Sequence, residues 1–210
     1  MAIIKSGAST DQLTVDTTSK AARVTLYDTL GRALGFQAKA TFFCSGSFTP
    51  VATPTDLVTI YGSATKTVRV LSIRIGVVNT AAGSQAFNLI KRSSVNTAGT
   101  FVAGTAVQAD SAKATATATC GHYTANPSVL GTAVGTMNII KVGSPAVTPA
   151  SWAGITDAAQ WEMIAIVEAG LGLHDVPVLN GVAQGLAINF AAAALVAGQV
   201  HHYNIVWIEE

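Results

Sequence analysis

The feature that most constrains the fold of this 210-residue chain is its alternation of apolar and polar residues, which recurs in short runs. A period of two places apolar side chains on one face of a β-strand, whereas a helix needs a period near 3.6. No helical pattern longer than two turns is present, although residues 148–161 could include one short helical turn. The chain is therefore predicted to be all-β.

About eight strands are predicted beyond residue 55, separated by turn signals. They are "DLVTIYG" (56–62), "KTVRVLSIRIGVV" (66–78), "SQAFNLIKR" (84–92), "KATATATCGHY" (113–123), "GTMNIIKV" (135–142), "QWEMIAIVEAG" (160–170), "GLAINF" (185–190) and "HHYNIVWIE" (201–209). The first two read as a hairpin, and Asn180-Gly181 signals a turn. In the second, one face is predicted to carry Leu71, Ile73, Ile75 and Val77, and the other Val68 and Val70.

This pattern predicts an antiparallel two-sheet sandwich. A jelly-roll-like arrangement is favoured, although the spacing does not distinguish it from another Greek-key sandwich. In the third predicted strand, Phe87 and Leu89 share a face, and Trp161 and Trp207 are predicted to lie in the core.

The first 40 residues differ from the rest of the chain. Three short strand-like runs, "AIIK" (2–5), "QLTV" (12–15) and "ARVTLYD" (22–28), are separated by polar segments and carry too few apolar groups for a core. Residues 41–55, "TFFCSGSFTPVATPT", read as a joint because Gly46, Pro50 and Pro54 mark turns. We therefore predict an extended N-terminal arm of short strands at 1–40 and a sandwich knob at 41–210.

The chain carries little charge, and that charge is unevenly placed. Charged residues make up 11%, against about 25% in an ordinary soluble domain. Because a surface with so little charge favours association with other protein, we expect other protein to cover much of it. Residues 1–141 hold 12 basic and five acidic residues, a net charge of +7, and the remaining six acidic residues give −6. These regions could steer one subunit onto another, or interleave within one domain.

Several classes of function are disfavoured. The basic residues are scattered singly apart from Lys91-Arg92, which does not favour nucleic-acid binding. The most apolar run, "LAINFAAAALVAG", is too short for a membrane span of about 20 residues. No basic segment followed by an apolar stretch and a cleavage site suggests a signal peptide.

The sequence predicts no catalytic residue, no cofactor and no metal site, and hence no enzyme. His201 and His202 are adjacent and would point to opposite faces of a strand, so we expect polar strand or interface residues there. Cys120 and His122 lack any motif that supports a nucleophile and its base. Cys44 and Cys120 lie far apart without a CxxC pair and are predicted to be buried thiols rather than a disulfide.

The N-terminal stretch "IKSGASTDQLTVDTTSKAARVTLYDTLGR" resembles that of a group of tailed-bacteriophage virion proteins. Further similar segments are "FTPVATPTDLVTIYGSATKTVRVLSI", "LIKRSSVNTAGT", "ATATATCGHYTANPSVLGTAVGT" and the ending "VWIEE". The chain departs from the group at "QADS" (108–111) and "SSVNTAG" (93–99). The matching arm residues are Ser9, Thr10, Asp11, Thr14, Val15, Asp16, Thr18, Ser19, Lys20, Ala21, Arg23, Val24, Thr25, Leu26, Tyr27 and Asp28.

The resemblance implies a structural component assembled in the host cytoplasm and built into the virion, most naturally a capsid decoration or cement protein on the capsid surface. Its partners would be the major capsid protein or other virion proteins, and further copies in a homo-oligomer, a dimer or trimer. We expect the arm to dock by strand addition and apolar contacts through Thr14, Val15, Arg23, Val24, Leu26 and Tyr27.

Two alternatives remain open at this point. One is another virion role, as a head-tail neck, tail or fibre-anchoring protein. The other is a receptor- or glycan-binding module, which an exposed aromatic cluster at the tip of the knob would favour.

Overall fold

The computed structural model describes residues 4–5, 12–13, 39–51, 55–144, 158–161, 176–191, 195–196 and 198–210. The chain divides into two compact units, Met1–Lys39 and Ala40–Glu210. In the first unit, β1 (Ile4–Lys5) and β2 (Gln12–Leu13) form an antiparallel pair. The second unit, called the knob here, holds all the other described strands.

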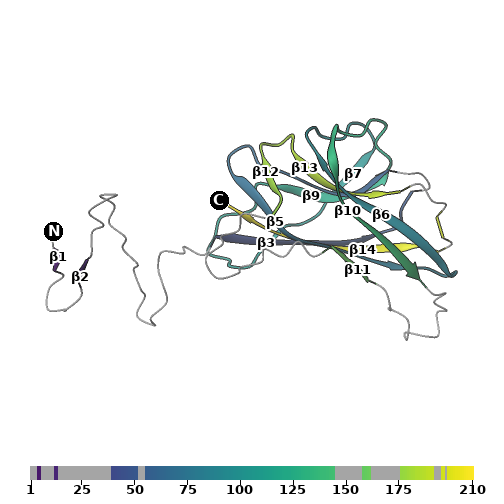
Figure 1. Cartoon of the computed structure of the whole chain (residues 1–210), viewed down its shortest axis with the longest axis horizontal. Coiled ribbons are helices and arrows are strands. Elements are labelled where there is room, and N and C mark those ends of the chain that lie inside the picture. Colours follow the sequence, from purple (N-terminus) through teal and green to yellow (C-terminus); the bar gives the residue numbers. More distant parts are fainter. Residues whose placement is uncertain are drawn as a thin grey trace. The chain divides into compact units, whose positions relative to one another are not determined.

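The knob is a sandwich of two antiparallel sheets (Figure 1). The β13 sheet has the order β10-β6-β13-β4-β9-β7, and the β14 sheet has the order β11-β5-β14-β3-β8, with β12 also paired to β5. The bounds are β3 Ala40–Phe48, β4 Asp56–Tyr61, β5 Thr67–Val78, β6 Gly83–Arg92, β7 Thr100–Ala103, β8 Val107–Gln108, β9 Thr119–Ala125, β10 Ala133–Ser144, β11 Ala158–Trp161, β12 Val178–Asn180, β13 Gly185–Phe190 and β14 Val200–Glu209.

The predicted all-β antiparallel sandwich is confirmed. Four strands in the order β3-β14-β5-β11 face four in the order β4-β13-β6-β10. Along the chain, successive strands of these eight alternate between the two sheets, except that β6 and β10 are neighbours in the same sheet. This is the connectivity of a jelly roll. Strands β7, β8 and β9 lie in the segment between β6 and β10, and they extend the two sheets beyond β4 and β3.

The core lies between the sheets and is built from large side chains of both. Trp207, Phe42, Phe87 and Phe190 are fully buried, and Phe42 stacks on Trp207 with ring centroids 5.6 Å apart. Phe87 and Leu89 share the buried face of β6, as predicted. The prediction for Trp207 is also confirmed, whereas the side chain of Trp161 lies outside the described residues.

The predicted hairpin of residues 56–62 and 66–78 is wrong. Strand β4 pairs with β13 and β9, whereas β5 pairs with β14, β11 and β12 in the opposite sheet. The intervening turn crosses between the sheets: the Gly62 backbone N–H donates to the Gln184 carbonyl, and that of Thr67 to the Glu210 carbonyl. A short turn between two strand patterns does not reveal whether the strands share a sheet.

The predicted faces of β5 are right for Ile73, Ile75 and Val77, which share a buried face, but wrong for Leu71, Val68 and Val70 because of a β-bulge. Val70 pairs with Trp207 and Ser72 with Val206, so Leu71 is an additional residue on β5. A bulge of this kind shifts the alternation by one residue. On both sides of the bulge, the valine and isoleucine side chains therefore point into the core, and Leu71 is only half-buried. The buried residues are Val68, Val70, Ile73, Ile75 and Val77.

Three further predictions are corrected. The predicted joint at 41–55 contains β3, which lies inside the β14 sheet with Phe42, Cys44 and Phe48 facing the core. Of the run 113–123, only residues from Thr119 onward form a strand. The sequence allows a short helical turn at 148–161, but the last four of these residues form strand β11. The rest lies outside the described residues.

The oppositely charged regions interleave within the knob. Lys66 Nζ lies 3.6 Å from Glu209 Oε2, and Arg69 forms an ion pair with Glu210. Within the described residues, no helix has the length and apolar character needed to cross a membrane.

Candidate functional site

The six predicted attachment residues, Thr14, Val15, Arg23, Val24, Leu26 and Tyr27, lie outside the described residues. The described chemistry therefore belongs to the knob. It comprises an aromatic pocket, a buried ion pair, a buried carboxylate, a buried histidine and a disulfide.

The aromatic pocket lies on the outer face of the β13 sheet and has a volume of about 280 Å³. Its main walls are Tyr61 on β4, Phe101 on β7 and Tyr123 on β9, three strands that are neighbours in the sheet. Because Val58 and Ile60 face the core, alternation turns Tyr61 outward. Ring centroids lie 6.4 Å apart for Tyr61 and Phe101, and 5.1 Å apart for Phe101 and Tyr123.

The polar groups of this pocket are neutral. The Tyr61 and Tyr123 hydroxyls lie 3.1 Å apart, and the Asn96 backbone N–H donates to the Tyr61 hydroxyl at 3.2 Å. Burial raises the pKa of Tyr123, and its hydrogen bond with Tyr61 raises it further. Tyr123 therefore stays a neutral phenol at physiological pH. A small apolar side chain or a single sugar ring fits these dimensions better than a drug-sized ligand.

An ion pair beside the pocket fixes the loop that forms its rim. The fully buried Asp56 carboxylate accepts two bonds from Arg92, from Nε at 2.5 Å and from Nη2 at 2.6 Å. It also accepts bonds from the side-chain amides of Asn96 (2.9 Å) and Asn189 (2.8 Å). The Asn96 side chain in turn accepts from the Gly131 backbone N–H at 2.7 Å. Four donors occupy the carboxylate, and through Asn96 this ion pair holds the loop in position.

His201 is a core residue rather than a polar strand or interface residue as predicted. Its side chain is fully buried among the rings of Phe48, Phe87 and Phe190. Burial, together with the nearby charge of His202, lowers the pKa of His201 to about 3, so its imidazole is neutral. His202 points to the exposed face, as strand alternation predicted.

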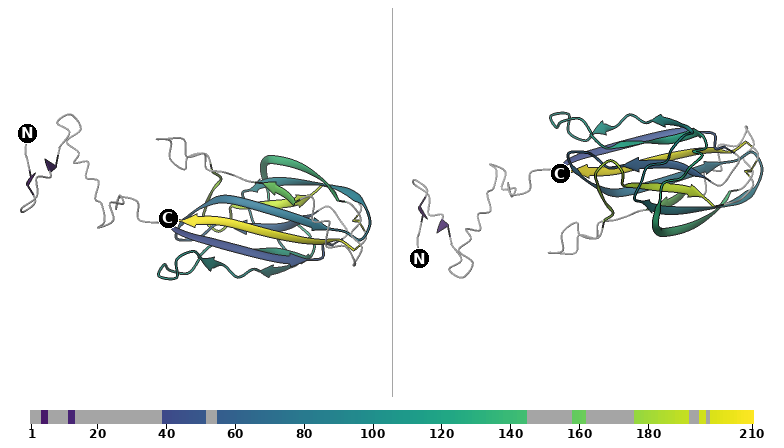
Figure 2. Two further views of the ribbon diagram at one scale, coloured as in Figure 1. Left: turned by 90° about the horizontal axis from the view of Figure 1, so that it is seen from below. Right: turned by 90° about the horizontal axis from the view of Figure 1, so that it is seen from above.

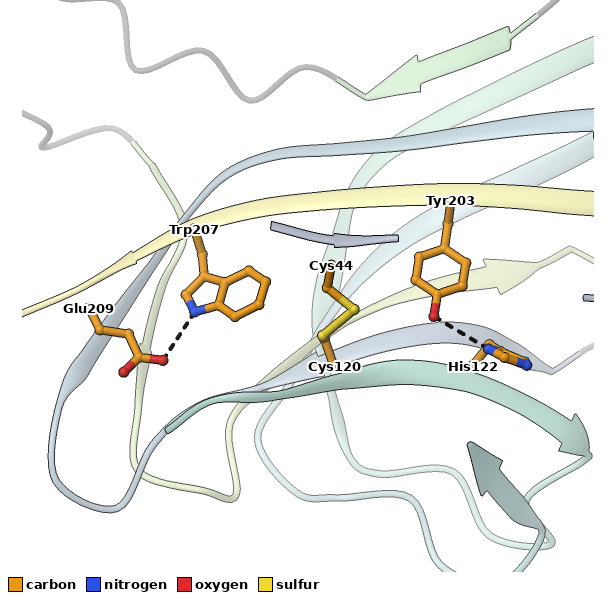
Figure 3. The surroundings of a disulfide bond; sticks show 6 residues. All are labelled: Cys44, Cys120, His122, Tyr203, Trp207 and Glu209. Atoms are coloured by element: carbon orange, nitrogen blue, oxygen red, sulfur yellow. Dashed lines mark hydrogen bonds between the residues drawn. A yellow bond between two sulfur atoms is a disulfide. The ribbon is translucent and has the colours of Figure 1, made fainter. Parts of the chain in front are cut away.

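Cys44 and Cys120 form a disulfide, so the prediction of two buried free thiols is wrong about their bonding (Figure 3). Both are buried, as predicted, with Cα atoms 6.8 Å apart. Cys44 lies on β3 and Cys120 on β9, so the bond joins the two sheets across the core. Their separation of 76 residues concealed this pairing, because only the packing of the sheets brings the two side chains together.

Near the disulfide, His122 and Tyr203 connect the two sheets through their side chains. The Tyr203 hydroxyl lies 3.3 Å from His122 Nδ1 (Figure 3). The His122 ring also stacks on Phe48. Burial lowers the pKa of His122. With Cys120 in a disulfide, no thiol nucleophile is available beside this histidine.

Glu209 was not singled out by the sequence, yet its buried carboxylate connects the C-terminal strand to residues 117–118. Oε1 accepts from Trp207 Nε1 at 3.1 Å (Figure 3) and from the Ala118 N–H at 2.9 Å. Oε2 accepts from the Thr117 hydroxyl at 2.7 Å. Burial alone would raise the pKa of Glu209, but these hydrogen bonds outweigh it and the pKa is lowered. An acidic residue one position from the C-terminus gave no signal of burial.

Among the described residues, no group of three or more His, Cys, Asp or Glu side chains could hold a metal ion. The chain matches no protein-family model, no curated protein and no solved structure.

Proposed function

We propose that this protein is a structural component of a tailed-phage virion, most specifically a capsid decoration or cement protein. It assembles in the host cytoplasm as a homo-oligomer, a dimer or trimer, and the N-terminal arm attaches each knob to the major capsid protein or another virion protein. Cementing of this kind needs no catalytic residue, cofactor or nucleic acid. Many weak contacts in a symmetric shell add up through high effective concentration.

The observation that carries this proposal is the division of the chain into a short N-terminal unit, Met1–Lys39, and a sandwich knob. The N-terminal unit carries the segment that most resembles phage virion proteins. Its two described strands are only two residues long, and such short strands need further strands to form a stable sheet. A neighbouring sheet edge would supply those strands.

The surface of the knob supports assembly with other protein. No Asp, Glu, Lys or Arg occurs between Ala114 and Ile140. This stretch contains five of the exposed large apolar side chains, namely Val129, Leu130, Val134, Met137 and Ile139. Depletion of charge and exposed apolar groups are typical of surfaces that bury against protein.

Removal of residues 2–30 tests the attachment role. We expect the truncated protein to fold but not to bind particles that lack the wild-type protein. Co-sedimentation with such particles measures this binding. A finer variant, Val24→Asp with Leu26→Asp, places two charges on one face of the predicted arm strand and should also abolish binding. Its matched control, Thr18→Asp, lies outside the predicted strands and should bind. Normal occupancy by the truncated protein contradicts the proposal.

Copy number separates this role from a neck, tail or fibre-anchoring role. A shell protein is present in hundreds of copies per particle and a neck or tail protein in a dozen or fewer. Gel densitometry of purified particles against the major capsid protein gives this number. A count near twelve favours the second role.

The aromatic pocket favours one candidate of another class, a glycan-binding module. Tyr61, Phe101 and Tyr123 offer ring surfaces and hydroxyls, the groups that bind a sugar ring. Glycan-array binding that is lost in Phe101→Ala but kept in Val107→Ala, a control in the other sheet, would favour this function. Particle binding by the arm would be unaffected by either substitution.

A further inference from the structure

One edge of the β13 sheet is formed by β10. Strand β10 ends one side of this sheet and the four-residue β7 ends the other, and Figure 2 shows them along opposite edges of the knob. Among the described residues, no strand pairs with the outer side of β10. Its large apolar side chains are exposed, by 64% for Val134, 48% for Met137 and 68% for Ile139.

The second half of β10 is regular enough to pair with another strand. Register shifts leave Val134 and Met137 as additional residues, but Asn138–Ser144 pairs with β6 without interruption. The Ile139 N–H donates to the Asn138 side chain at 2.8 Å, which shows that this N–H faces away from β6. Because backbone groups alternate in direction along an antiparallel strand, those of Lys141 and Gly143 also face the open edge.

The composition of β10 lacks most devices that protect sheet edges. Natural edge strands are commonly blocked by charged side chains, proline or bulges. Strand β10 has its two bulges in the first half only, no proline, and a single charge at Lys141. Within the described part of the chain, one further group protects this edge: the Asn138 side chain, which accepts a hydrogen bond from the Ile139 N–H.

We infer that β10 is the surface through which two copies of this chain associate. The two β10 strands pair antiparallel, edge to edge about a two-fold axis, and join their β13 sheets into one continuous sheet. With Ile140 at the axis, the uninterrupted segments 138–142 of the two strands pair with each other, and each Lys141 lies opposite Ile139 of the other copy, so no like charges meet. A two-fold contact between identical uncharged strands is self-complementary. This inference rests on the homo-oligomer of the proposed function and is independent of where the arm binds.

The first test measures association in solution by sedimentation equilibrium. We expect the full chain to form a dimer that Ile139→Lys weakens at least tenfold, because the new charge would lie opposite Lys141 of the other copy. The matched control Val182→Lys, at an exposed apolar residue outside β10, should remain dimeric. Asn138→Ala frees the Ile139 N–H and should tighten the dimer. A monomer or trimer of the full chain, or a dimer indifferent to Ile139→Lys, overturns the inference.

Two further measurements fix the partner strand. A chain lacking residues 2–30 should remain dimeric, and loss of the dimer would instead identify the arm of a second copy as the occupant of this edge. Ile139→Cys should be crosslinked to its mate by a short bis-maleimide, whereas Gly143→Cys lies far from its own mate and should not. Circular dichroism confirms that each variant is folded. Failure of the arm to bind particles would leave these results unchanged, so the two proposals fail separately.

Discussion

At the scale of single residues, the buried carboxylate of Glu209 accepts hydrogen bonds from three other residues, although it lies next to the C-terminus. Glu209→Gln replaces an acceptor oxygen by an amide that faces the Thr117, Ala118 and Trp207 donors. We expect it to lower the free energy of unfolding by about 2–4 kcal/mol, since donors to a charged group lose their partner. The exposed ion pair of Glu210 with Arg69 makes Glu210→Gln the control, at under about 1 kcal/mol. Urea denaturation at pH 7 measures both.

The same carboxylate gives the protein an acid-sensitive step. The pKa of Glu209 is lowered in the folded protein from the ordinary 4.5, so the unfolded chain binds its proton first. Stability from this group is present above pH 4.5 and is lost as the pH falls through the folded pKa. In Glu209→Gln this part of the pH dependence should be absent. An unchanged slope below pH 4.5 would contradict the assignment.

His201 acts in a higher pH window. Because its pKa is lowered from 6.5 to about 3, the unfolded chain binds a proton that the folded chain excludes. Stability should fall as the pH drops from 6.5 towards 3, by up to about 1.4 kcal/mol per pH unit for one proton. His122, whose pKa is also lowered, adds to this slope. His201→Phe should remove its own share between pH 6.5 and 4.5, and His202→Gln controls for loss of an exposed imidazole.

At the scale of elements, the disulfide holds β3 of one sheet to β9 of the other. Closing a loop across the 76-residue separation stabilises the folded state by about 4 kcal/mol in the chain-entropy account. The double variant Cys44→Ala with Cys120→Ala should therefore melt at a lower temperature. A reductant should lower the melting temperature of the wild-type protein and leave that of the variant unchanged. Equal effects on both would show that the bond contributes nothing.

The proposed assembly in the host cytoplasm predicts when the disulfide forms. Reducing compartments disfavour disulfides, so Cys44 and Cys120 should be thiols in freshly made protein and bonded in released particles. Alkylation of denatured protein from quenched lysate and from purified virions, followed by mass spectrometry, reads the two states. A bond already complete in the lysate would contradict cytoplasmic assembly in a reducing host.

At the scale of the whole molecule, the knob has a core of its own. The buried apolar cluster runs from Phe42 to Trp207, all within the second unit. Residues 40–210 alone should therefore unfold in one cooperative transition, with a melting temperature within a few degrees of the full chain. Differential scanning calorimetry measures both. A large drop, or loss of the transition, would show that residues 1–39 complete the knob.

Much of the fold follows from local pattern. The period-two runs at 56–62, 84–92, 185–190 and 201–209 coincide with β4, β6, β13 and β14, because alternation depends only on neighbouring residues and one buried face. The candidate site could not be predicted from local pattern. Tyr61, Phe101 and Tyr123 are far apart in the sequence, and only the order of β4, β9 and β7 in one sheet makes them a pocket.

By itself, then, the sequence determined the all-β class, most strand positions and the polar character of the first 40 residues. Tertiary structure alone decided the sheet to which each strand belongs, the bulge at Leu71 that turns Val68 and Val70 into the core, and the Cys44–Cys120 bond. The physical reason is that strand propensity and alternation are local, whereas sheet pairing, bulges and disulfides depend on which distant segments pack together. The burial of Glu209 and His201 has the same origin, because their partners lie in segments that adjacent residues do not reveal.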